Sequence, residues 1–130
     1  MVVAEVAVAG VAVAADVVAA DSSPSGSMRG CLIEPSWTRH PRVRACMTTR
    51  GGGVSRGAYH SLNLATHVGD EPSAVEENRR RLRLHLGFAN EPRWLEQVHG
   101  IDVVRLEHAD PEATPRADAS WTNRSGLACA

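Results

Sequence analysis

The stretch that decides the fold is DEPSAVEENRRRLRLHLG, residues 70–87. Asp70 or Ser73 can cap the first turn of a helix, and Glu76 stands three residues after Ser73, as in a capping box. Gly87 lies where a left-handed C-cap is expected. The apolar side chains that recur on one face are Val75, Leu82 and Leu86. The pattern predicts an amphipathic helix that runs from about Asp70 to Leu86.

Short apolar runs on both sides of this helix predict strands. The runs are residues 43–49, 94–99, 102–106 and 127–130. Residues 108–118 are rich in Pro, Asp and Ala, which predicts a loop. A helix interleaved with strands indicates a fold of the α/β (α+β) class.

The composition limits the function classes. The chain has 130 residues, 43% of them hydrophobic and 22% charged, which fits one globular domain. The formal net charge of -1 argues against a nucleic-acid partner. All 14 basic residues are Arg, so a P-loop lysine and a Schiff-base lysine are both excluded. Three widely spaced cysteines and no membrane-spanning run predict a reduced, cytoplasmic protein without a membrane partner.

The first 27 residues differ from the rest of the chain. They are almost entirely Val and Ala and then become a Ser-rich polar stretch. Such low complexity, with no partner segment of matching character, predicts a disordered extension over residues 1–27. We therefore expect the authentic start at Met28 and a domain over residues 28–130.

The glycine-rich stretch of residues 47–55, MTTRGGGVS, is a candidate anion site. Arg50 provides a permanent positive charge beside three glycines, whose backbone amides can approach a phosphate or carboxylate closely. Glycine-rich turns between strands are common, and this one matches neither a Walker motif nor a dinucleotide fingerprint. By spacing alone, an ordinary turn is the favoured reading.

Two further groups of charged or titratable residues have ordinary explanations. The cluster Arg79, Arg80, Arg81 and Arg83 follows Glu76 and Glu77 at helical spacing, which favours ion pairs on a solvated face. None of the six histidines has a metal-site spacing. His99 ends a strand-like run before Gly100, a position from which side chains project into sites, although a lone histidine is more often structural.

An ordered series of motifs resembles a known family. The motifs are MTTRGGGVS (47–55), YHSLNL (59–64), VGD (68–70), NR (78–79) and QVHG (97–100). Together they closely resemble the laccase-domain family, also called the multicopper polyphenol oxidase-like or peptidoglycan-editing-factor family, over residues 30–130. The resemblance implies mixed β-sheets flanked by helices.

The resemblance also implies a metal site. His99, in QVHG, matches the family's first zinc ligand, and copper is the alternative metal. The family's other two ligands come from an Ala-Asp-Cys motif and a His-Ala-Gly-Trp-Arg-Gly motif, which these residues lack. Cys129 is not assigned as a ligand. The chain thus resembles the N-terminal half of a longer domain, truncated at its C-terminus.

The function that the resemblance implies is zinc-dependent purine nucleoside phosphorolysis. Adenosine, inosine and guanosine would react with inorganic phosphate, and adenosine deaminase and methylthioadenosine phosphorylase activities would accompany this reaction. Arg50 would stabilise the phosphate. Ser61 and Asn63 would contact substrate, although Asn63 can equally satisfy backbone groups of its own turn. The alternatives are copper-dependent polyphenol oxidation, editing of peptidoglycan precursors, or an inactive, non-catalytic fragment.

Overall fold

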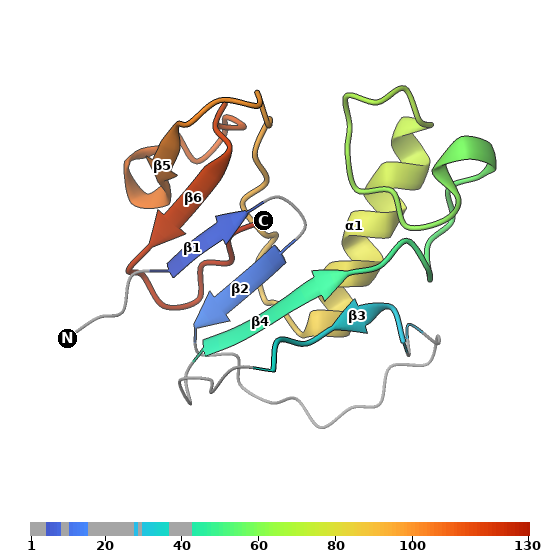
Figure 1. The fold of residues 1–130 in the computed structure, drawn as a ribbon, viewed down its shortest axis with the longest axis horizontal. Helices are drawn as coiled ribbons and strands as arrows, with labels where there is room; N and C mark the ends of the chain where they lie inside the picture. The colour runs from blue at the N-terminus through green and yellow to red at the C-terminus, as the bar shows by residue number, and fades with distance from the viewer. Residues whose placement is uncertain (1–4, 9–10, 16–27, 29, 37–42) are drawn as a thin grey trace.

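A computed structural model of the chain describes residues 5–8, 11–15, 28, 30–36 and 43–130. Its strands are β1 (Glu5–Val8), β2 (Val11–Ala15), β3 (Leu32–Ile33), β4 (Val43–Thr48), β5 (Val103–Arg105) and β6 (Ala119–Thr122). The helix α1 covers Pro72–Leu86, and short 3-10 helices cover Gly57–Tyr59 and Leu106–His108. Along the described part of the chain four strands precede α1 and two follow it, and the predicted α/β (α+β) class is confirmed (Figure 1).

The strands form two three-stranded sheets. One has the order β2-β4-β3 with both pairs antiparallel. The other has the order β1-β6-β5, in which β1 is antiparallel and β5 parallel to β6. β1 and β2 are consecutive in the chain but belong to different sheets, so these two strands connect the sheets (Figure 1).

The strands β1 and β2 differ from the disordered extension expected over residues 1–27. β1 pairs with β6 from Glu5 to Val8, and β2 pairs with β4 from Val11 to Ala15. A β-ladder joins backbone groups, so a Val/Ala segment needs only an open sheet edge and no partner of similar composition. The expectation is wrong for these two strands. The other residues of the extension lie outside the described residues, and the boundary at Met28 stays a prediction.

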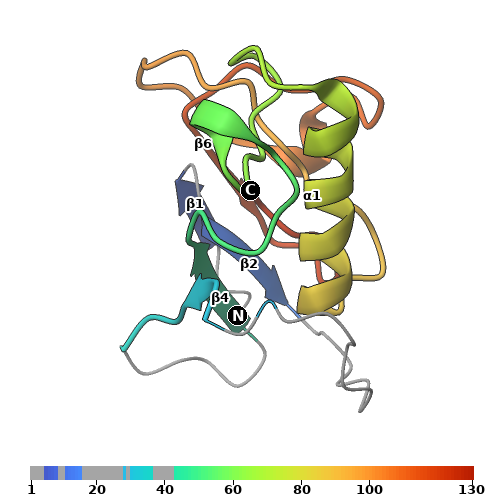
Figure 2. The same cartoon turned by 90° about the vertical axis from the view of Figure 1, so that its right-hand side faces the viewer.

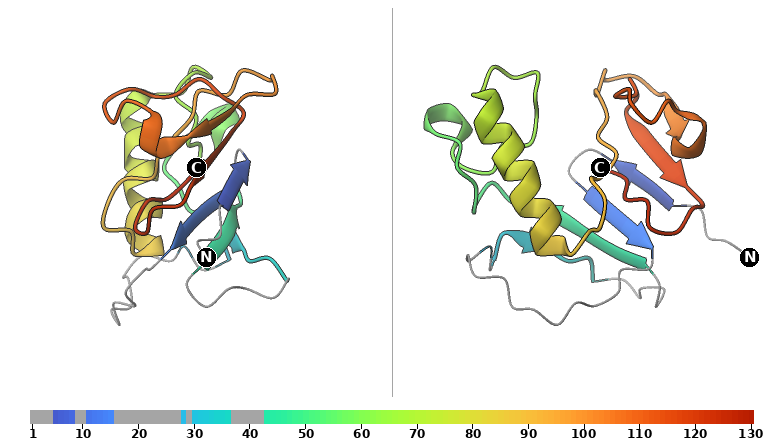
Figure 3. Two further views of the ribbon diagram at one scale, coloured as in Figure 1. Left: turned by 90° about the vertical axis from the view of Figure 1, so that its left-hand side faces the viewer. Right: turned by 180° about the vertical axis from the view of Figure 1, so that it is seen from behind.

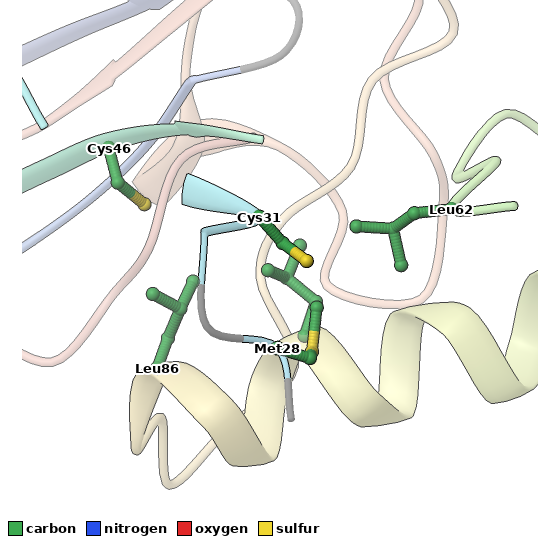
Figure 4. Close-up of a cluster of buried hydrophobic side chains, with 6 residues drawn as sticks. Met28, Cys31, Cys46, Leu62 and Leu86 are labelled. Carbon is green, nitrogen blue, oxygen red and sulfur yellow. The ribbon is translucent and has the colours of Figure 1, made fainter. Parts of the chain in front are cut away.

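The helix packs against the antiparallel sheet through its apolar face. The main core consists of Met28, Cys31, Cys46, Leu62, Leu82 and Leu86, all nearly inaccessible to solvent (Figure 4). Val75, Leu82 and Leu86 are buried, as the periodicity predicted. Seen from the side, α1 forms one flank of the molecule (Figure 2), and from behind its C-terminal end lies beside β3 and β4 (Figure 3).

The ends of the helix follow the prediction only in part. Gly87 caps the C-terminus at φ 71°, and the amide of Phe88 donates to the Arg83 carbonyl oxygen. The N-cap is Glu71, without a side-chain cap bond, so the predicted caps and the capping box are wrong. Asp70 is instead drawn toward the preceding loop, because its carboxylate accepts a hydrogen bond from the Ser55 hydroxyl.

The predicted strands have mixed outcomes. Residues 43–49 form β4 almost throughout, and residues 102–106 contain β5. Residues 94–99 form no regular strand, because Glu96 bridges only to Arg116, within an irregular segment. Near the C-terminus, Cys129 makes a single bridge to Arg93. No helix in the described part of the chain is long and apolar enough to cross a membrane.

Candidate functional site

His99 lies at the tip of an exposed turn with an unusual backbone conformation. Its φ of 57° is the one positive value outside glycine among the described residues. On the N-terminal side of the turn, the Glu96 amide donates to the Pro115 carbonyl oxygen at 2.9 Å, and the Ala117 amide donates to that of Glu96 at 3.1 Å. The turn is therefore attached to the segment that leads into β6.

Asp118 accepts hydrogen bonds from three consecutive amides of this turn. Its Oδ1 lies 3.2 Å from the amide nitrogen of Val98 and 2.6 Å from that of His99. Its Oδ2 lies 2.6 Å from the amide nitrogen of Gly100. Sequence reasoning missed Asp118, because it ends the loop of residues 108–118 and nothing local relates it to a turn 18 to 20 residues earlier.

A cleft of about 470 Å³ opens beside the His99 turn. Its walls are residues 64–67, Arg79, residues 94–97, Asp118 and Ala130, together with two further residues of the loop before β6. The cleft thus brings the end of the YHSLNL motif next to the start of the QVHG motif. His99 itself does not line the cleft, but Gln97 and Asp118 do.

Arg50 lies on a different, shallower hollow of about 350 Å³, which Asn63 also lines. The Arg50 Nε donates to the His60 carbonyl oxygen at 2.8 Å, and one Nη donates to the Ala58 carbonyl oxygen at 3.3 Å. The two bonds use two of the five N–H donors of a guanidinium group. This hollow and the cleft beside His99 have no lining residue in common, so the structure brings Arg50 and Asn63 together but not with His99.

Ser61 and Asn63, the other predicted substrate contacts, bind within their own loop. The Ser61 hydroxyl is buried, donates to the Arg50 carbonyl oxygen at 3.1 Å and accepts from the Gly53 amide at 3.2 Å. A Cβ on Gly53 would lie 2.1 Å from the Ser61 carbonyl oxygen, so this glycine permits close packing of two backbone segments. The Asn63 side chain donates to the carbonyl oxygen of Ala65 and accepts from the amide of Ala65. Asn63 thus satisfies backbone groups of its own turn, which was the alternative to a substrate contact.

Asn78 ties this loop to α1. Its side chain is fully buried, its Oδ1 accepts from the Val54 amide at 2.8 Å, and its Nδ2 donates to Ser55, Ser61 and Asn63. Hydrogen bonds from the side chains of Ser55 and Asn63 lower the pKa of the Asp70 carboxyl below its ordinary value. The anion at Asp70 is therefore part of the loop's internal bonding.

The arginine cluster on α1 divides into two environments. Arg80 and Arg81 pair with Glu77 at 2.7 Å, with side chains 53% and 41% exposed, so the predicted solvated face is confirmed for both. Arg79 differs: it is half-buried, its guanidinium carbon lies 4.2 Å from the centre of the Trp94 ring, and its Nε donates to the Leu64 carbonyl oxygen. Burial lowers the pKa of Arg79.

The described residues do not complete a metal site. No group of three His, Cys, Asp or Glu side chains lies close enough to hold a metal ion in the described part of the chain. Zinc sites in enzymes generally use three protein ligands. His99 alone does not meet that requirement, and Cys129 is fully buried.

Most of this chain is similar in sequence to known proteins. The family model for the multi-copper polyphenol oxidoreductase laccase matches residues 44–130. Purine nucleoside phosphorylase PA4543 of Pseudomonas aeruginosa is 55% identical over 97 residues, which are 75% of this chain and 38% of that protein. Purine nucleoside phosphorylase YfiH of Escherichia coli K12 is 52% identical over 99 residues, covering 76% of this chain and 40% of that protein.

A solved structure shows the same fold. Protein NMB0706 of Neisseria meningitidis superposes with a TM-score of 0.63 and 43% identity over 71% of this chain and 37% of the other. The chain spans about two-fifths of the length of the curated relatives it matches. The match over residues 44–130 covers well over half of the chain. The chain therefore belongs to the multi-copper polyphenol oxidoreductase laccase family.

Proposed function

We propose that this chain carries part of a cytoplasmic purine nucleoside phosphorylase that cleaves adenosine, inosine and guanosine with inorganic phosphate. The observation that carries the proposal is the 55% identity to a protein of that name across 97 residues. The family model, which matches residues 44–130, covers the loops that build the cleft and the His99 turn. Adenosine deaminase and methylthioadenosine phosphorylase activities belong to the same proposal.

In this proposal Arg50 binds phosphate. Phosphorolysis replaces the bond between the ribose anomeric carbon and the base with a bond to a phosphate oxygen, so an anion must be held close to the sugar. The two bonds to the His60 and Ala58 carbonyl oxygens fix the guanidinium plane, and its other N–H groups can donate to phosphate oxygens. A cation held in advance stabilises the reacting anion without reorganising during the reaction. Substrate contacts by Ser61 and Asn63 stay a prediction.

Zinc at His99 is the metal part of the proposal, with copper as the alternative. The described residues supply one ligand of the required set, so we derive no catalytic step through the metal. What the chain itself provides is an exposed imidazole beside a cleft of about 470 Å³.

A chimera tests the function. The matched segment of the P. aeruginosa relative is replaced by the corresponding segment of this chain, and release of the free base from inosine, adenosine and guanosine is measured with and without phosphate. We expect phosphate-dependent release from the chimera and none from the 130-residue chain alone. Oxidation of a phenol without base release would favour the activity that the family description names.

Single substitutions in the chimera assign the roles. His99→Ala is expected to abolish base release, and Arg50→Ala is expected to raise the KM for phosphate. His108→Ala and Arg56→Ala are the matched controls, because both residues are exposed and of the same types. If the controls lose as much activity as the two test variants, the assignment of His99 and Arg50 is wrong.

A further inference from the structure

The backbone of His99 is held in a conformation that needs support. A φ of 57° lies in the left-handed region, which non-glycine residues rarely occupy, although histidine is among the more tolerant ones. Residues in sparsely populated backbone conformations persist only where their surroundings impose them. Residues that contact the turn must therefore hold His99 in this conformation.

Asp118 supplies the contacts at the centre of the turn. Three successive amides converge on its two carboxylate oxygens, and the bonds from His99 and Gly100 are both 2.6 Å long. Successive amides around a residue of positive φ form a concave anion site, and hydrogen bonds to a carboxylate are stronger than those between neutral groups. A Cβ on Gly100 would lie 3.2 Å from Oδ2, so the carboxylate also packs closely against this glycine.

The backbone around Asp118 holds the two ends of the turn but not its tip. Before the turn, the Ala117 amide donates to the Glu96 carbonyl oxygen. After the turn, the amides of Asp118 and Ala119 donate to the Asp102 carbonyl oxygen at 3.1 and 3.3 Å. The start of β6 thus brackets the turn from both sides. The Asp118 carboxylate fills the space between these two attachments.

We propose that Asp118 is a positioning residue, whose carboxylate holds residues 98–100 so that the imidazole of His99 is presented at solvent beside the cleft. The proposal rests on the proposed function, in which His99 acts beside that cleft. Asp118 lines the cleft, but both of its carboxylate oxygens are bonded to the turn, and in this proposal it acts through His99. An ordinary loop attachment would stabilise the fold equally whatever residue occupied position 99, whereas a positioning residue is coupled to His99.

The experiment compares Asp118→Asn with the parent 130-residue chain by NMR. Asparagine has the same shape, but its amide group cannot accept the hydrogen bonds that one carboxylate oxygen accepts. We expect the three-bond coupling between the amide and α protons of His99 to change. We also expect amide exchange to accelerate at least about tenfold at whichever of His99 and Gly100 loses its acceptor, since the two amides bond different oxygens of Asp118. Asp102→Asn is the matched control, because its side chain is exposed and lies in the same region.

A double-mutant cycle separates positioning from simple attachment. His99→Gly removes the left-handed strain. The parent recovers this strain when Asp118→Asn releases the turn, so Asp118→Asn should lower the melting temperature by about 5 °C in the parent and by more in the His99→Gly chain. Equal losses in both chains, or an unchanged His99 coupling in Asp118→Asn, would overturn the proposal. If Asp118→Asn does not fold, Gly100→Ala, whose Cβ would press on Oδ2, must shift the His99 coupling in its place.

A kinetic measurement connects the result to catalysis. In the chimera, Asp118→Asn is expected to lower kcat at least about tenfold while leaving the KM for phosphate unchanged, because misplaced catalytic groups slow the reaction without removing a phosphate contact. A kcat equal to that of the parent chimera would overturn positioning as a catalytic role. If the parent chimera has no phosphorylase activity, the proposed function fails, while the NMR and the cycle still decide whether Asp118 positions His99.

Discussion

The side-chain amide of Asn78, in the middle of α1, donates a 2.9 Å hydrogen bond to the hydroxyl of Ser55, which lies 23 residues earlier in the chain. The same nitrogen lies 3.1 Å from the Ser61 carbonyl oxygen and 2.8 Å from that of Asn63. One helical side chain therefore fixes three points of the loop that carries Arg50 at its start. The loop's conformation depends on the helix beneath it.

Replacement of Asn78 by alanine is expected to destabilise the protein by about 3 kcal/mol. The substitution removes the Asn78 partner of the Val54 amide and of the Asn63 carbonyl oxygen, and each buried polar group left without a partner costs about 1–3 kcal/mol. Urea unfolding measures the change. Asn90→Ala, at an exposed position, should stay within about 0.5 kcal/mol of the parent. Equal effects of the two substitutions would contradict the structural role of Asn78.

Replacement of Leu82 by alanine is expected to cost about 2–5 kcal/mol, because the side chain is 2% exposed in the main core and its loss leaves a cavity. Leu84→Ala on the same helix is the control, since Leu84 is 52% exposed. Thermal unfolding of both variants checks the prediction. The packing of α1 described above would be wrong if Leu84→Ala were the more damaging of the two.

The stability of the protein is expected to fall in acid through Glu107. Burial raises the pKa of Glu107, but hydrogen bonds from Thr122, Asn123 and Arg105 outweigh burial and lower the pKa to about 2. A depressed folded-state pKa contributes stability above the ordinary value of 4.5, and this contribution is lost as the pH falls toward 2.

A comparison of variants across pH measures this contribution. The difference in melting temperature between the parent and Glu107→Gln should be constant above about pH 5 and shrink between about pH 4.5 and 2. Glu112→Gln, at an exposed position, should leave the parent's pH dependence unchanged. A difference for Glu107→Gln that does not vary with pH would contradict the assignment.

Arg79 and Arg80 are adjacent but should respond differently to replacement by alanine. Arg79 stacks on Trp94 and bonds the Leu64 carbonyl oxygen, so its loss is expected to cost about 1–2 kcal/mol. Arg80 is exposed and pairs only with Glu77 among the described contacts, which is worth under about 1 kcal/mol. Urea unfolding gives the two values. Tryptophan fluorescence should change in Arg79→Ala and stay constant in Arg80→Ala.

Sequence patterns predicted the elements whose signals are local. The periodicity of Val75, Leu82 and Leu86 and the glycine after them were sufficient to place α1, and the run of residues 43–49 placed β4. The ordered motifs were sufficient to identify the family. The helix and strand signals are each contained within a few turns or a few residues, and the order of the motifs is read directly along the chain, so no knowledge of distant contacts is needed.

The roles of individual polar residues were harder to predict, because they depend on distant neighbours. Arg79 has the same sequence surroundings as Arg80, yet Trp94, 15 residues later, makes it a half-buried stacking residue. The pairing of β1 and β2 depends on open edges of β4 and β6, which the composition of residues 5–15 does not reveal.

By itself, the sequence determined the helix, the strand before the glycine loop, the α/β class and the family, because local spacing and ordered motifs carry that information. Only the tertiary structure decided that Asp118 holds the His99 turn, that Asn78 organises the loop of Arg50, and that the hollow lined by Arg50 is separate from the cleft beside the His99 turn. Hydrogen bonds and burial bring together residues that are far apart in the chain, and these contacts form only when the chain folds.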